Sequence, residues 1–397
     1  MPGTVERVWE SQPSAPGGRR ARAGFRYSAF LPDPIAEIQP VVPFETADLA
    51  ADAEAAIRAL NDQDSVAGLE AIGPLLLRSE AVASSRIEGY DVSPLNLARA
   101  LINPRAARGS ARIVAANVSA MEEAIAIGDR DRSLELGDLL SIHRTLMATD
   151  ERARPGELRL EQNWIGGRFG NPSDARYIPP PEDEVPRLMD DLVAFCNRED
   201  LPPIPQAAIA HAQLETIHPF VDGNGRVGRC LIHVIFRRRA TAPRFVPPVS
   251  IVLAARPDAY VDGLVSFREG RLADWISSFA AASLSAATAS IELADRVARL
   301  QLAWHRRAGR PRSGSAAAKI IGLLPALPVL SAPTARAAIG VSQQQTLAGL
   351  KSLAEAGVVR QISAGTYDRQ YAAAELFDLL AEYESLVVGP RRPGPAG

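Results

Sequence analysis

The spacing of apolar residues along the chain predicts a protein built mainly from α-helices. Between residues 46 and 302, apolar side chains recur every three or four positions, as in ADLAADAEAAIRAL, LGDLLSIHRTLM and EVPRLMDDLVAFC. Asp183 and Asp274 stand where two of these helices would begin. The stretch 275–288 is short and rich in Ser and Ala, and it lacks the roughly 20 strongly apolar residues of a bilayer-spanning helix. A buried helix is expected there.

Two segments interrupt the helical pattern. Residues 163–181 read NWIGGRFGNPSDARYIPPP, where glycines and an Asn-Pro pair separate short β-prone pieces. This pattern predicts a β-hairpin or flap that ends at the prolines. Residues 306–315 contain Gly, Pro, Arg and Ser without an apolar pattern, which is typical of a linker.

The segment after the linker is expected to form a winged helix-turn-helix domain. The pattern predicts helices over 316–324, 334–339 and 343–356, with Ser342 as N-cap and Gly357 as the stop of the third. Two β-prone pieces around Gly365 would pair as a small wing. These signals divide the chain into a flexible arm (1–24), an N-terminal helical region (25–110), a helical core (111–305), a linker (306–315), the winged-helix domain (316–385) and a flexible tail (386–397).

Composition and charge place limits on the partners. The chain has 397 residues with a formal net charge of −2, so no overall positive field indicates nucleic acid. Its two cysteines, Cys196 and Cys230, are far apart, which excludes a disulfide scaffold and fits a reduced, cytoplasmic compartment. The first 25 residues contain no apolar segment typical of a signal peptide, and no membrane partner is expected.

Residues 218–229, HPFVDGNGRVGR, carry the strongest chemical signal. A helix is expected to end at His218, because Pro219 disfavours the helical conformation of the residue before it. The tight turn Gly223-Asn224-Gly225 would then open a new helix. The first N–H groups of that helix would point outward and, with the helix dipole, form an anion site.

The charged residues of this stretch suit phosphate chemistry. Arg226 and Arg229 are three positions apart, so both guanidinium groups can lean to one side of the first turn and contact phosphate oxygens. Asp222 offers a hard oxygen ligand for Mg²⁺ shared with phosphates. His218 is a base that can accept a hydroxyl proton near neutral pH.

Other interpretations of the glycine turn are weaker. Gly223, Gly225 and Gly228 satisfy G-x-G-x-x-G, but a helix and a proline precede them instead of a strand, and residues 240–250 contain no acid. The chain has no Walker A sequence. A purely structural turn would not explain why a histidine, an acid, an asparagine and two arginines converge there.

A metal site on the preceding helix is also weak. His211, Glu215 and His218 stand at helical spacing, but they do not form an H-E-x-x-H motif. His211 is expected to pack or cap within the helix.

The sequence HPFVDGNGRVGR resembles the signature of the Fic family, H-x-F-x-(D/E)-G-N-G-R-x-x-R, at every defined position. The resemblance implies an enzyme that moves the AMP of ATP onto a Ser, Thr or Tyr hydroxyl of a target protein. Gly225 favours AMP transfer, since a phosphorylating relative has lysine there. The implied roles are general base for His218, Mg²⁺ ligand for Asp222, phosphate-binding anion hole for Gly223, Asn224 and Gly225, β- and γ-phosphate ligands for Arg226 and Arg229, and core anchor for Phe220.

The resemblance extends over roughly residues 25–375. FRYSAFLP, ADWISSF and the C-terminal winged helix are similar to regions of longer Fic proteins, and the predicted flap resembles the family's target-docking flap. The flap residues so implied are Gly166, Gly167, Ala175, Arg176, Tyr177 and Ile178.

A second motif, SSRIEG at 84–89, resembles the family's inhibitory motif (S/T)-x-x-x-E-(G/N). Gly89 is suited to end a helix, which leaves Glu88 at the C-terminus, where the dipole disfavours a carboxylate by about 0.3 to 1 kcal/mol. The resemblance implies that Glu88 pairs with Arg229 in the place of the γ-phosphate, and that Ser84 holds the helix. An ordinary exposed glutamate is the alternative.

Two other functions stay open beside AMP transfer. One is a hydrolase that removes AMP at the same site, with Glu88 orienting a water molecule. The other is a DNA-binding regulator that acts through the winged helix. The expected recognition helix has one lysine, Lys351, and Arg336 lies in the helix before it, which is little positive charge for a duplex binder. A protein-contact or homodimer role for this domain is favoured over DNA binding.

Overall fold

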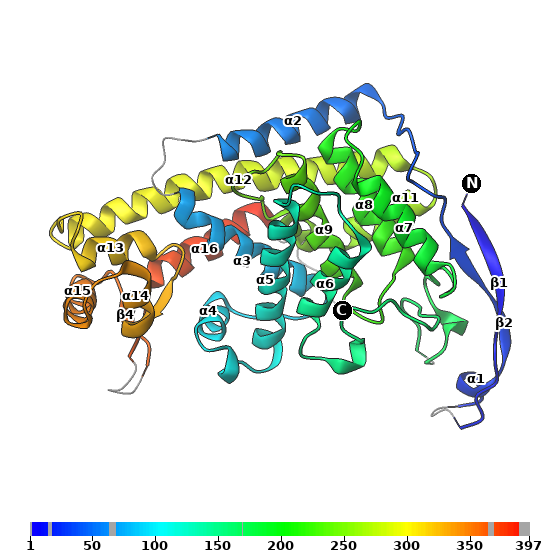
Figure 1. Cartoon of the computed structure of the whole chain (residues 1–397), viewed down its shortest axis with the longest axis horizontal. Coiled ribbons are helices and arrows are strands. Elements are labelled where there is room, and N and C mark those ends of the chain that lie inside the picture. The colour runs from blue at the N-terminus through cyan, green and yellow to red at the C-terminus, as the bar shows by residue number, and fades with distance from the viewer. Residues whose placement is uncertain (1, 15–17, 63–68, 169, 364–368, 389–397) are drawn as a thin grey trace, which may run out of the picture. The chain divides into compact units, whose positions relative to one another are not determined.

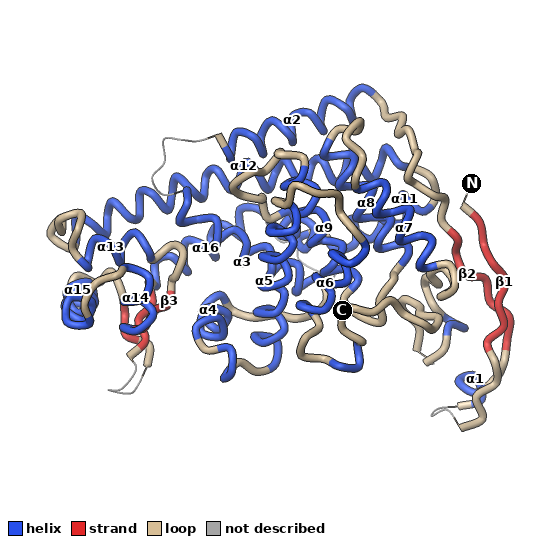
Figure 2. The backbone as a smooth tube through the Cα atoms, in the orientation of Figure 1, coloured by secondary structure: helices blue, strands red, loops and turns tan. Residues whose placement is uncertain are grey.

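The computed structural model describes residues 2–14, 18–62, 69–168, 170–363 and 369–388. Within these ranges helices dominate, and the named strands belong to a two-stranded ribbon and a small three-stranded sheet (Figures 1 and 2). The prediction of a mainly α-helical fold is confirmed. The chain divides into two compact units, and each unit combines segments that are far apart in sequence.

Unit 1 comprises residues 1–51, 119–241 and 258–281. Its centre is α8, which packs against α7 and α9 and has every residue buried. The elements that lie within this unit are β1 (Gly3–Trp9), α1 (Arg19–Arg22), β2 (Phe25–Leu31), α6 (Leu136–Leu146), η2 (Glu151–Ala153), η3 (Pro172–Asp174), α7 (Val185–Cys196), α8 (Pro203–Ile217) and α9 (Asn224–Arg238).

Unit 2 comprises residues 52–118, 242–257 and 282–397. Its elements are α3 (Leu69–Ile87), α4 (Pro94–Ile102), η1 (Pro104–Ala106), α10 (Val249–Ala255), α13 (Ala316–Leu323), β3 (Val329–Ser331), α14 (Ala332–Ile339), α15 (Gln343–Glu355), β4 (Arg360–Gln361), β5 (Gln370–Ala372) and α16 (Ala374–Val388). The unit boundaries fall within or at the end of four further helices, α2 (Phe44–Asn61), α5 (Gly109–Gly128), α11 (Pro257–Arg268) and α12 (Leu272–Arg307).

The C-terminal elements have the order that the sequence predicts. Helices α13, α14 and α15 are followed by β4 and β5, which pair with β3 in the sheet order β3-β5-β4. Ser342 caps α15 in a capping box with Gln345, and Gly357 ends it with a φ of 68°. The expected wing tip around Gly365 lies outside the described residues. The assignment as a winged helix stays a prediction.

The N-terminus differs from the flexible arm expected over residues 1–24. Strand β1 pairs with β2 in an antiparallel register that runs from Gly3↔Leu31 to Trp9↔Phe25. The Gly, Pro, Ser and Arg content of this segment indicated mobility. However, TVERVW is rich in β-branched and aromatic residues, its half-buried side chains alternate with exposed ones as in a strand, and its partner is the next strand along the chain.

Two helix starts and the linker also differ from expectation. The N-cap of α7 is Glu184, while Asp183 pairs with Arg7 instead, and α12 begins ahead of Asp274. Helix α12 continues to Arg307, into the expected linker, because Trp304 is fully buried and donates through Nε1 to Glu375.

Helix α12 includes the buried helix expected over 275–288. By length and composition alone, its apolar part would also be sufficient to cross a membrane, and half of that part is buried inside the structure. A core helix has the same properties.

Gly263 allows close packing of α11 against α12. A Cβ at this position would lie 2.6 Å from Cε3 of Trp275, whose ring is 1% exposed and whose Nε1 donates to the Ala208 carbonyl at 2.7 Å. We therefore expect Gly263→Ala to lower the free energy of unfolding by about 1 to 3 kcal/mol, measured as the urea midpoint at constant m-value. Gly137→Ala in α6 is the control, because its Cβ would meet open space. An unchanged midpoint for Gly263→Ala would contradict this account of the packing.

Candidate active site

The end of α8 places His218 as the sequence predicts. His218 is the C-cap of this helix and adopts left-handed backbone angles, φ 51° and ψ 59°, and its N–H donates to the Leu214 carbonyl at 2.9 Å. A side chain other than glycine rarely adopts this conformation, and it persists only where neighbouring contacts hold it. The strain is a typical feature of a functional residue.

The loop from Phe220 to Asn224 is closed by two reciprocal hydrogen bonds. The Phe220 N–H donates to Oδ1 of Asn224 at 2.8 Å, and Nδ2 of Asn224 donates to the Phe220 carbonyl at 2.9 Å. Phe220 is fully buried, in agreement with its expected anchoring role. The side chain of Asn224 therefore stabilises the loop, and it is the main-chain N–H of this residue that could bind an anion.

Gly223 is the N-cap of α9 and has a φ of 83°. A Cβ there would lie 3.1 Å from Sδ of Met147, so both the conformation and the space require glycine. The first helical bond is donated by Val227 to Gly223. The N–H groups of the three residues before Val227 have no acceptor within the helix, which makes this turn suited to an anion.

The two motif arginines are buried beside this turn. Arg226 is 2% exposed and Arg229 is 0% exposed. Nη2 of Arg226 lies 3.5 Å from Oδ1 of Asp222, whose side chain is 51% exposed. A buried guanidinium is costly unless anionic or polar groups face it. A phosphate bound at the turn would therefore meet two cationic groups that are already ordered.

A polar network that sequence reasoning missed supports Arg229. Nη1 of Arg229 lies 3.9 Å from Oε1 of Glu215 and 3.5 Å from Oη of Tyr260. The Tyr260 hydroxyl donates to Glu215 at 3.3 Å and accepts from Nε2 of His211 at 2.9 Å. His211 thus packs within the core, as expected, and burial lowers its pKa to about 3. Gly228 lets α9 approach this ring, because a Cβ there would lie 2.9 Å from Nδ1 of His211.

His143 of α6 is a second contact that the sequence did not indicate. Its Nδ1 accepts the Gly156 N–H at 3.0 Å, so the ring proton is on Nε2, which donates to the Asp222 carbonyl at 3.1 Å. The ring stacks on Phe220 with centroids 3.9 Å apart. Burial lowers the pKa of His143 to about 4, which keeps the ring neutral. It therefore positions the backbone of Asp222 without adding charge to the anion turn.

Arg159 and Asn163 hold the carbonyl of His218. Nε of Arg159 donates to this carbonyl at 2.9 Å and Nη1 donates to the Glu161 carbonyl at 3.0 Å. Nδ2 of Asn163 donates to the carbonyls of His218 and Phe220 at 3.2 and 3.1 Å. These bonds fix the strained end of α8. The sequence carried no signal for them, because both residues come from irregular chain without periodicity.

The predicted flap is present at residues 163–181. Ile165 and Tyr177 form an antiparallel bridge, in which the Ile165 N–H donates to the Tyr177 carbonyl at 2.8 Å. Gly166 and Gly167 turn the chain with φ of 78° and 90°. Tyr177 anchors the flap, since its hydroxyl donates to the Thr216 carbonyl at 2.7 Å.

Beyond Tyr177, the other flap residues differ in exposure. Arg176 is exposed, whereas Ala175 and Ile178 are half-buried.

Helix α3 ends as the sequence predicts. The Tyr90 N–H donates to the Ser85 carbonyl and the Gly89 N–H donates to the Arg86 carbonyl, both at 3.0 Å, while Gly89 has a φ of 83°. This is a Schellman motif with Glu88 as C-cap residue, and the Glu88 side chain is exposed.

The same helix is fixed by a buried amide. Ser84 and Ser85 are fully buried, and Nδ2 of Asn117 donates to Oγ of Ser85 at 3.0 Å. Ser84 and Glu88 belong to unit 2 and the catalytic motif to unit 1. The pairing of Glu88 with Arg229 stays a prediction.

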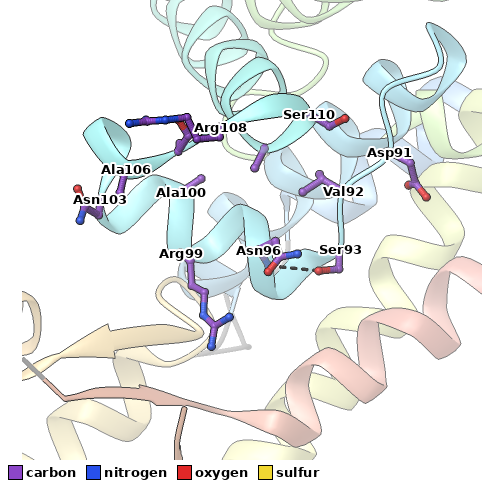
Figure 3. Close-up of a pocket in the computed structure, with 12 residues that line it drawn as sticks. Asp91, Val92, Ser93, Asn96, Arg99, Ala100, Asn103, Ala106, Arg108 and Ser110 are labelled. Carbon is purple, nitrogen blue, oxygen red and sulfur yellow. Dashed lines mark hydrogen bonds between the residues drawn. The ribbon is translucent and has the colours of Figure 1, made fainter. Parts of the chain in front are cut away.

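A separate cavity of about 490 Å³ lies within unit 2 between α4, the following turn and the start of α5 (Figure 3). It contains none of the motif residues. Its lining includes Arg99, which donates to the Ile362 carbonyl, and Arg108, which donates to the carbonyls of Arg105 and Ala107. Both guanidinium groups thus serve the local fold, and this cavity has no place in the candidate site.

The buried His143 predicts an acid-sensitive fold. The unfolded chain takes up a proton near the ordinary pKa of 6.5, whereas the folded protein does so only near pH 4. Neutral His143 therefore makes its full contribution to the free energy of unfolding above pH 6.5. This contribution should decrease by up to roughly 3 kcal/mol as the pH falls from 6.5 to 4. His143→Gln should flatten the dependence of the urea midpoint on pH between 7 and 4.5. The half-buried His305→Gln is the control, and equal slopes for both variants would contradict the assignment.

Comparison with known proteins agrees with this geometry. Residues 133–236 match the Fic/DOC family profile. The chain is 33% identical over 117 residues to protein adenylyltransferase Fic of Drosophila erecta, which covers 29% of this chain and 22% of that protein. It is 31% identical over 130 residues to protein adenylyltransferase fic-1 of Caenorhabditis elegans, which covers 32% of this chain and 23% of that protein. The chain thus spans less than a quarter of the length of these curated relatives.

Two solved structures share the fold. A Fic family protein from Desulfovibrio desulfuricans superposes with a TM-score of 0.52 at 24% identity, over 85% of this chain and 98% of that one. A Fic domain containing signaling protein from Bacteroides thetaiotaomicron gives a TM-score of 0.52 at 18% identity, over 62% of this chain and 97% of that one. The segment that matches the Fic/DOC family contains the histidine, the glycine turn and both arginines, so the candidate site lies within the part of the chain that is similar to Fic proteins.

Proposed function

We propose that this protein transfers the AMP of ATP to a hydroxyl side chain of a target protein, on Ser, Thr or Tyr. The observation that carries the proposal is the start of α9, six residues after the strained histidine, where two buried arginines lie beside N–H groups that have no acceptor within the helix. This arrangement suits a triphosphate on one side of the turn and a proton acceptor on the other. The names of the curated relatives support the same activity.

In the proposed reaction, the target hydroxyl oxygen attacks the α-phosphorus of ATP. The bond between that phosphorus and the oxygen bridging to the β-phosphate breaks, and pyrophosphate leaves. His218 accepts the hydroxyl proton. Arg226 and Arg229 bind the β- and γ-phosphates, and the N–H groups of the turn stabilise the negative charge that develops on the phosphate oxygens.

Asp222 is the residue suited to hold Mg²⁺. Its carboxylate is half exposed, and one oxygen is fixed by the Gly223 N–H at 2.6 Å. One carboxylate is a sufficient protein ligand for Mg²⁺ when phosphates and water complete the shell. When bound, the ion would neutralise charge on the phosphates and on the leaving pyrophosphate.

The flap is the proposed docking element for the target. Gly166 and Gly167 set its turn, and the segment from Ala175 to Ile178, bridged to Ile165 through Tyr177, is its second arm. An extended target segment could pair with this arm and bring its hydroxyl to His218, as in other cases of strand addition.

We further propose that Glu88 restrains the enzyme by pairing with Arg229. The Schellman end of α3 presents the Glu88 carboxylate, exposed, at a helix C-terminus that disfavours negative charge. A cationic partner would relieve this cost. Occupying Arg229 would remove one ligand of the γ-phosphate.

The two alternative functions have less support. Removal of AMP by water would use the same groups, and the label assay below separates it from transfer. DNA binding is not favoured, because Lys351 on α15 lies 3.8 Å from Glu355, which offsets its charge.

The first test uses ATP labelled on the α-phosphate, Mg²⁺ and a bacterial protein extract. The full-length protein should place α-label on protein, whereas γ-label should not be transferred. His218→Ala should lower the rate by at least about a hundredfold, because the general base is lost. His305→Ala in α12 is the matched control and should retain the wild-type rate.

Two results would contradict the proposal. Incorporation of γ-label would indicate phosphoryl transfer with ATP bound in the opposite direction. A wild-type rate in His218→Ala would remove this residue from the mechanism.

The second test addresses the restraint. Glu88→Gly should raise the transfer rate about tenfold to a hundredfold, because one charge-assisted pair no longer competes with the γ-phosphate. Glu88→Gln should also raise it, since the charge is removed while the side-chain size is kept. Arg229→Ala and the double variant Glu88→Gly/Arg229→Ala should both be inactive in the same assay.

The double variant is the informative one. Activity in the double variant would show that Arg229 is dispensable for transfer. If Glu88→Gly is no faster than wild type at saturating ATP, with unchanged thermal stability, Glu88 does not restrain the enzyme.

A further inference from the structure

The N-terminal ribbon presents one face toward the interior of unit 1. In the antiparallel pairing of β1 and β2, Arg7 lies opposite Tyr27 and Trp9 opposite Phe25, so these side chains share a face. Arg26 on β2 lies on the other face and is exposed. Figure 1 shows the two strands as a long two-stranded ribbon.

Hydrogen bonds and an ion pair attach this ribbon, and the chain between its strands, to the flap. The Phe30 N–H of β2 donates to the Ile178 carbonyl at 2.9 Å, next to the Tyr177 bridge of the flap. Arg7 pairs with Asp183, just after the flap, at 2.6 Å. Nδ2 of Asn171, within the flap, donates to the Arg20 carbonyl at 3.0 Å.

Aromatic contacts join the inner face of the ribbon to the base of the flap. Trp9 meets Trp164 edge to face with ring centroids 5.5 Å apart, and the Tyr27 hydroxyl donates to Oε1 of Gln162 at 3.4 Å. The ribbon and the flap are therefore one connected surface.

A cavity of about 750 Å³ opens along this junction. In the described part of the chain eight large hydrophobic side chains are exposed, and three of them, Val8, Leu160 and Val221, line this cavity. Exposed apolar side chains scattered singly are ordinary, but several at one hollow are typical of a binding surface. Its other lining residues are Trp9, Gln12, Tyr27, Arg152, Arg154, Arg159, Glu161, Gln162, Asn163, Trp164 and Glu182.

The cavity adjoins the catalytic histidine. Asn163 and Arg159 both line it and both donate to the His218 carbonyl. Val221, three residues after His218, is half exposed into it. A target segment bound along the flap, with its hydroxyl at His218, would therefore extend into this cavity.

Charge at the rim indicates the chemistry of the occupant, because three arginines (Arg152, Arg154 and Arg159) line the cavity against two glutamates (Glu161 and Glu182). Arg152 is exposed, lines the cavity, and forms no ion pair with any described residue. Arg154 beside it is paired with Glu157 at 3.3 Å. An acidic group on the occupant would therefore find its partner at Arg152.

We propose that the ribbon and the flap base form a recognition groove for the target protein, which takes a segment carrying a large apolar side chain next to an acidic residue. The apolar side chain contacts Leu160, Val221 and Trp9, and the acidic residue contacts Arg152. This groove selects the target, while the flap orients its hydroxyl. The inference rests on the proposed function, since it assigns the groove to the protein that receives AMP.

The experiment measures α-label transfer to extract proteins by the full-length Glu88→Gly protein and by further variants in that background. Leu160→Asp and Arg152→Glu should each lower transfer by about tenfold or more, as expected for residues at the centre of an interface. The matched controls are Val41→Asp, another highly exposed apolar residue of unit 1, and Arg271→Glu, an exposed arginine of unit 1 that does not line the cavity. Both controls should label at the parent rate.

Two further measurements separate recognition from other causes. Binding of a non-hydrolysable ATP analogue, measured by calorimetry, should be unchanged in Leu160→Asp. Because Leu160 is 68% exposed, this variant should also melt at the parent temperature. Random linear peptides displayed on phage and selected on the parent protein should be rich in an apolar residue beside Asp or Glu, and should not bind Leu160→Asp.

The outcomes distinguish the two proposals. Equal labelling by Leu160→Asp, Arg152→Glu and the parent would contradict target recognition at the groove, but not the proposed AMP transfer. Absence of label with the parent and with every variant would contradict the proposed function. Selected peptides that bind the Leu160→Asp variant as strongly as the parent would contradict the groove, whatever the result of the labelling experiment.

Discussion

The candidate site depends on the hydrogen bonds by which Arg159 fixes the end of α8. Its guanidinium is buried, and burial lowers its pKa to about 10, so the group stays charged at neutral pH and must be satisfied by polar atoms. Those atoms are backbone carbonyls, including that of His218. One buried cation therefore ties the strained residue to the chain that leads into the flap. The residue proposed to accept the hydroxyl proton and the flap proposed to dock the target are thus held by the same side chain.

Burial of the two motif arginines imposes a second constraint. Arg229 has a negative and a polar neighbour, Glu215 and Tyr260, at 3.9 and 3.5 Å. These groups help to hold the buried guanidinium in position. His143 holds the backbone of Asp222 in a comparable way, and because its ring stays neutral it does so without adding a positive charge beside the carboxylate.

Much of the site could be predicted from sequence because its parts are local. The proline after His218 ends a helix, the glycines after Asp222 make a turn, and each signal acts within a few residues. The end of α3 at Gly89 was predictable for the same reason. The supporting residues were not, since His143, Arg159 and Tyr260 reach the motif from segments distant along the chain and show no spacing that marks them. The N-terminal ribbon was not expected, because the Gly, Pro and Arg residues around it favour irregular chain, although TVERVW itself is rich in β-branched and aromatic residues.

The ribbon changes how target selection can be understood in this chain. A flap with one bridge of strand pairing is a weak template, because its few main-chain bonds are the same for any sequence. Selectivity has to come from side chains, and these must be held rigidly if binding is to discriminate between targets. The ion pair of Arg7 with Asp183 and the contact of Trp9 with Trp164 provide that rigidity from outside the flap. In the proposed mechanism, the chemistry of AMP transfer stays in the helical core, while the choice of target depends on a separate element that can vary without disturbing His218.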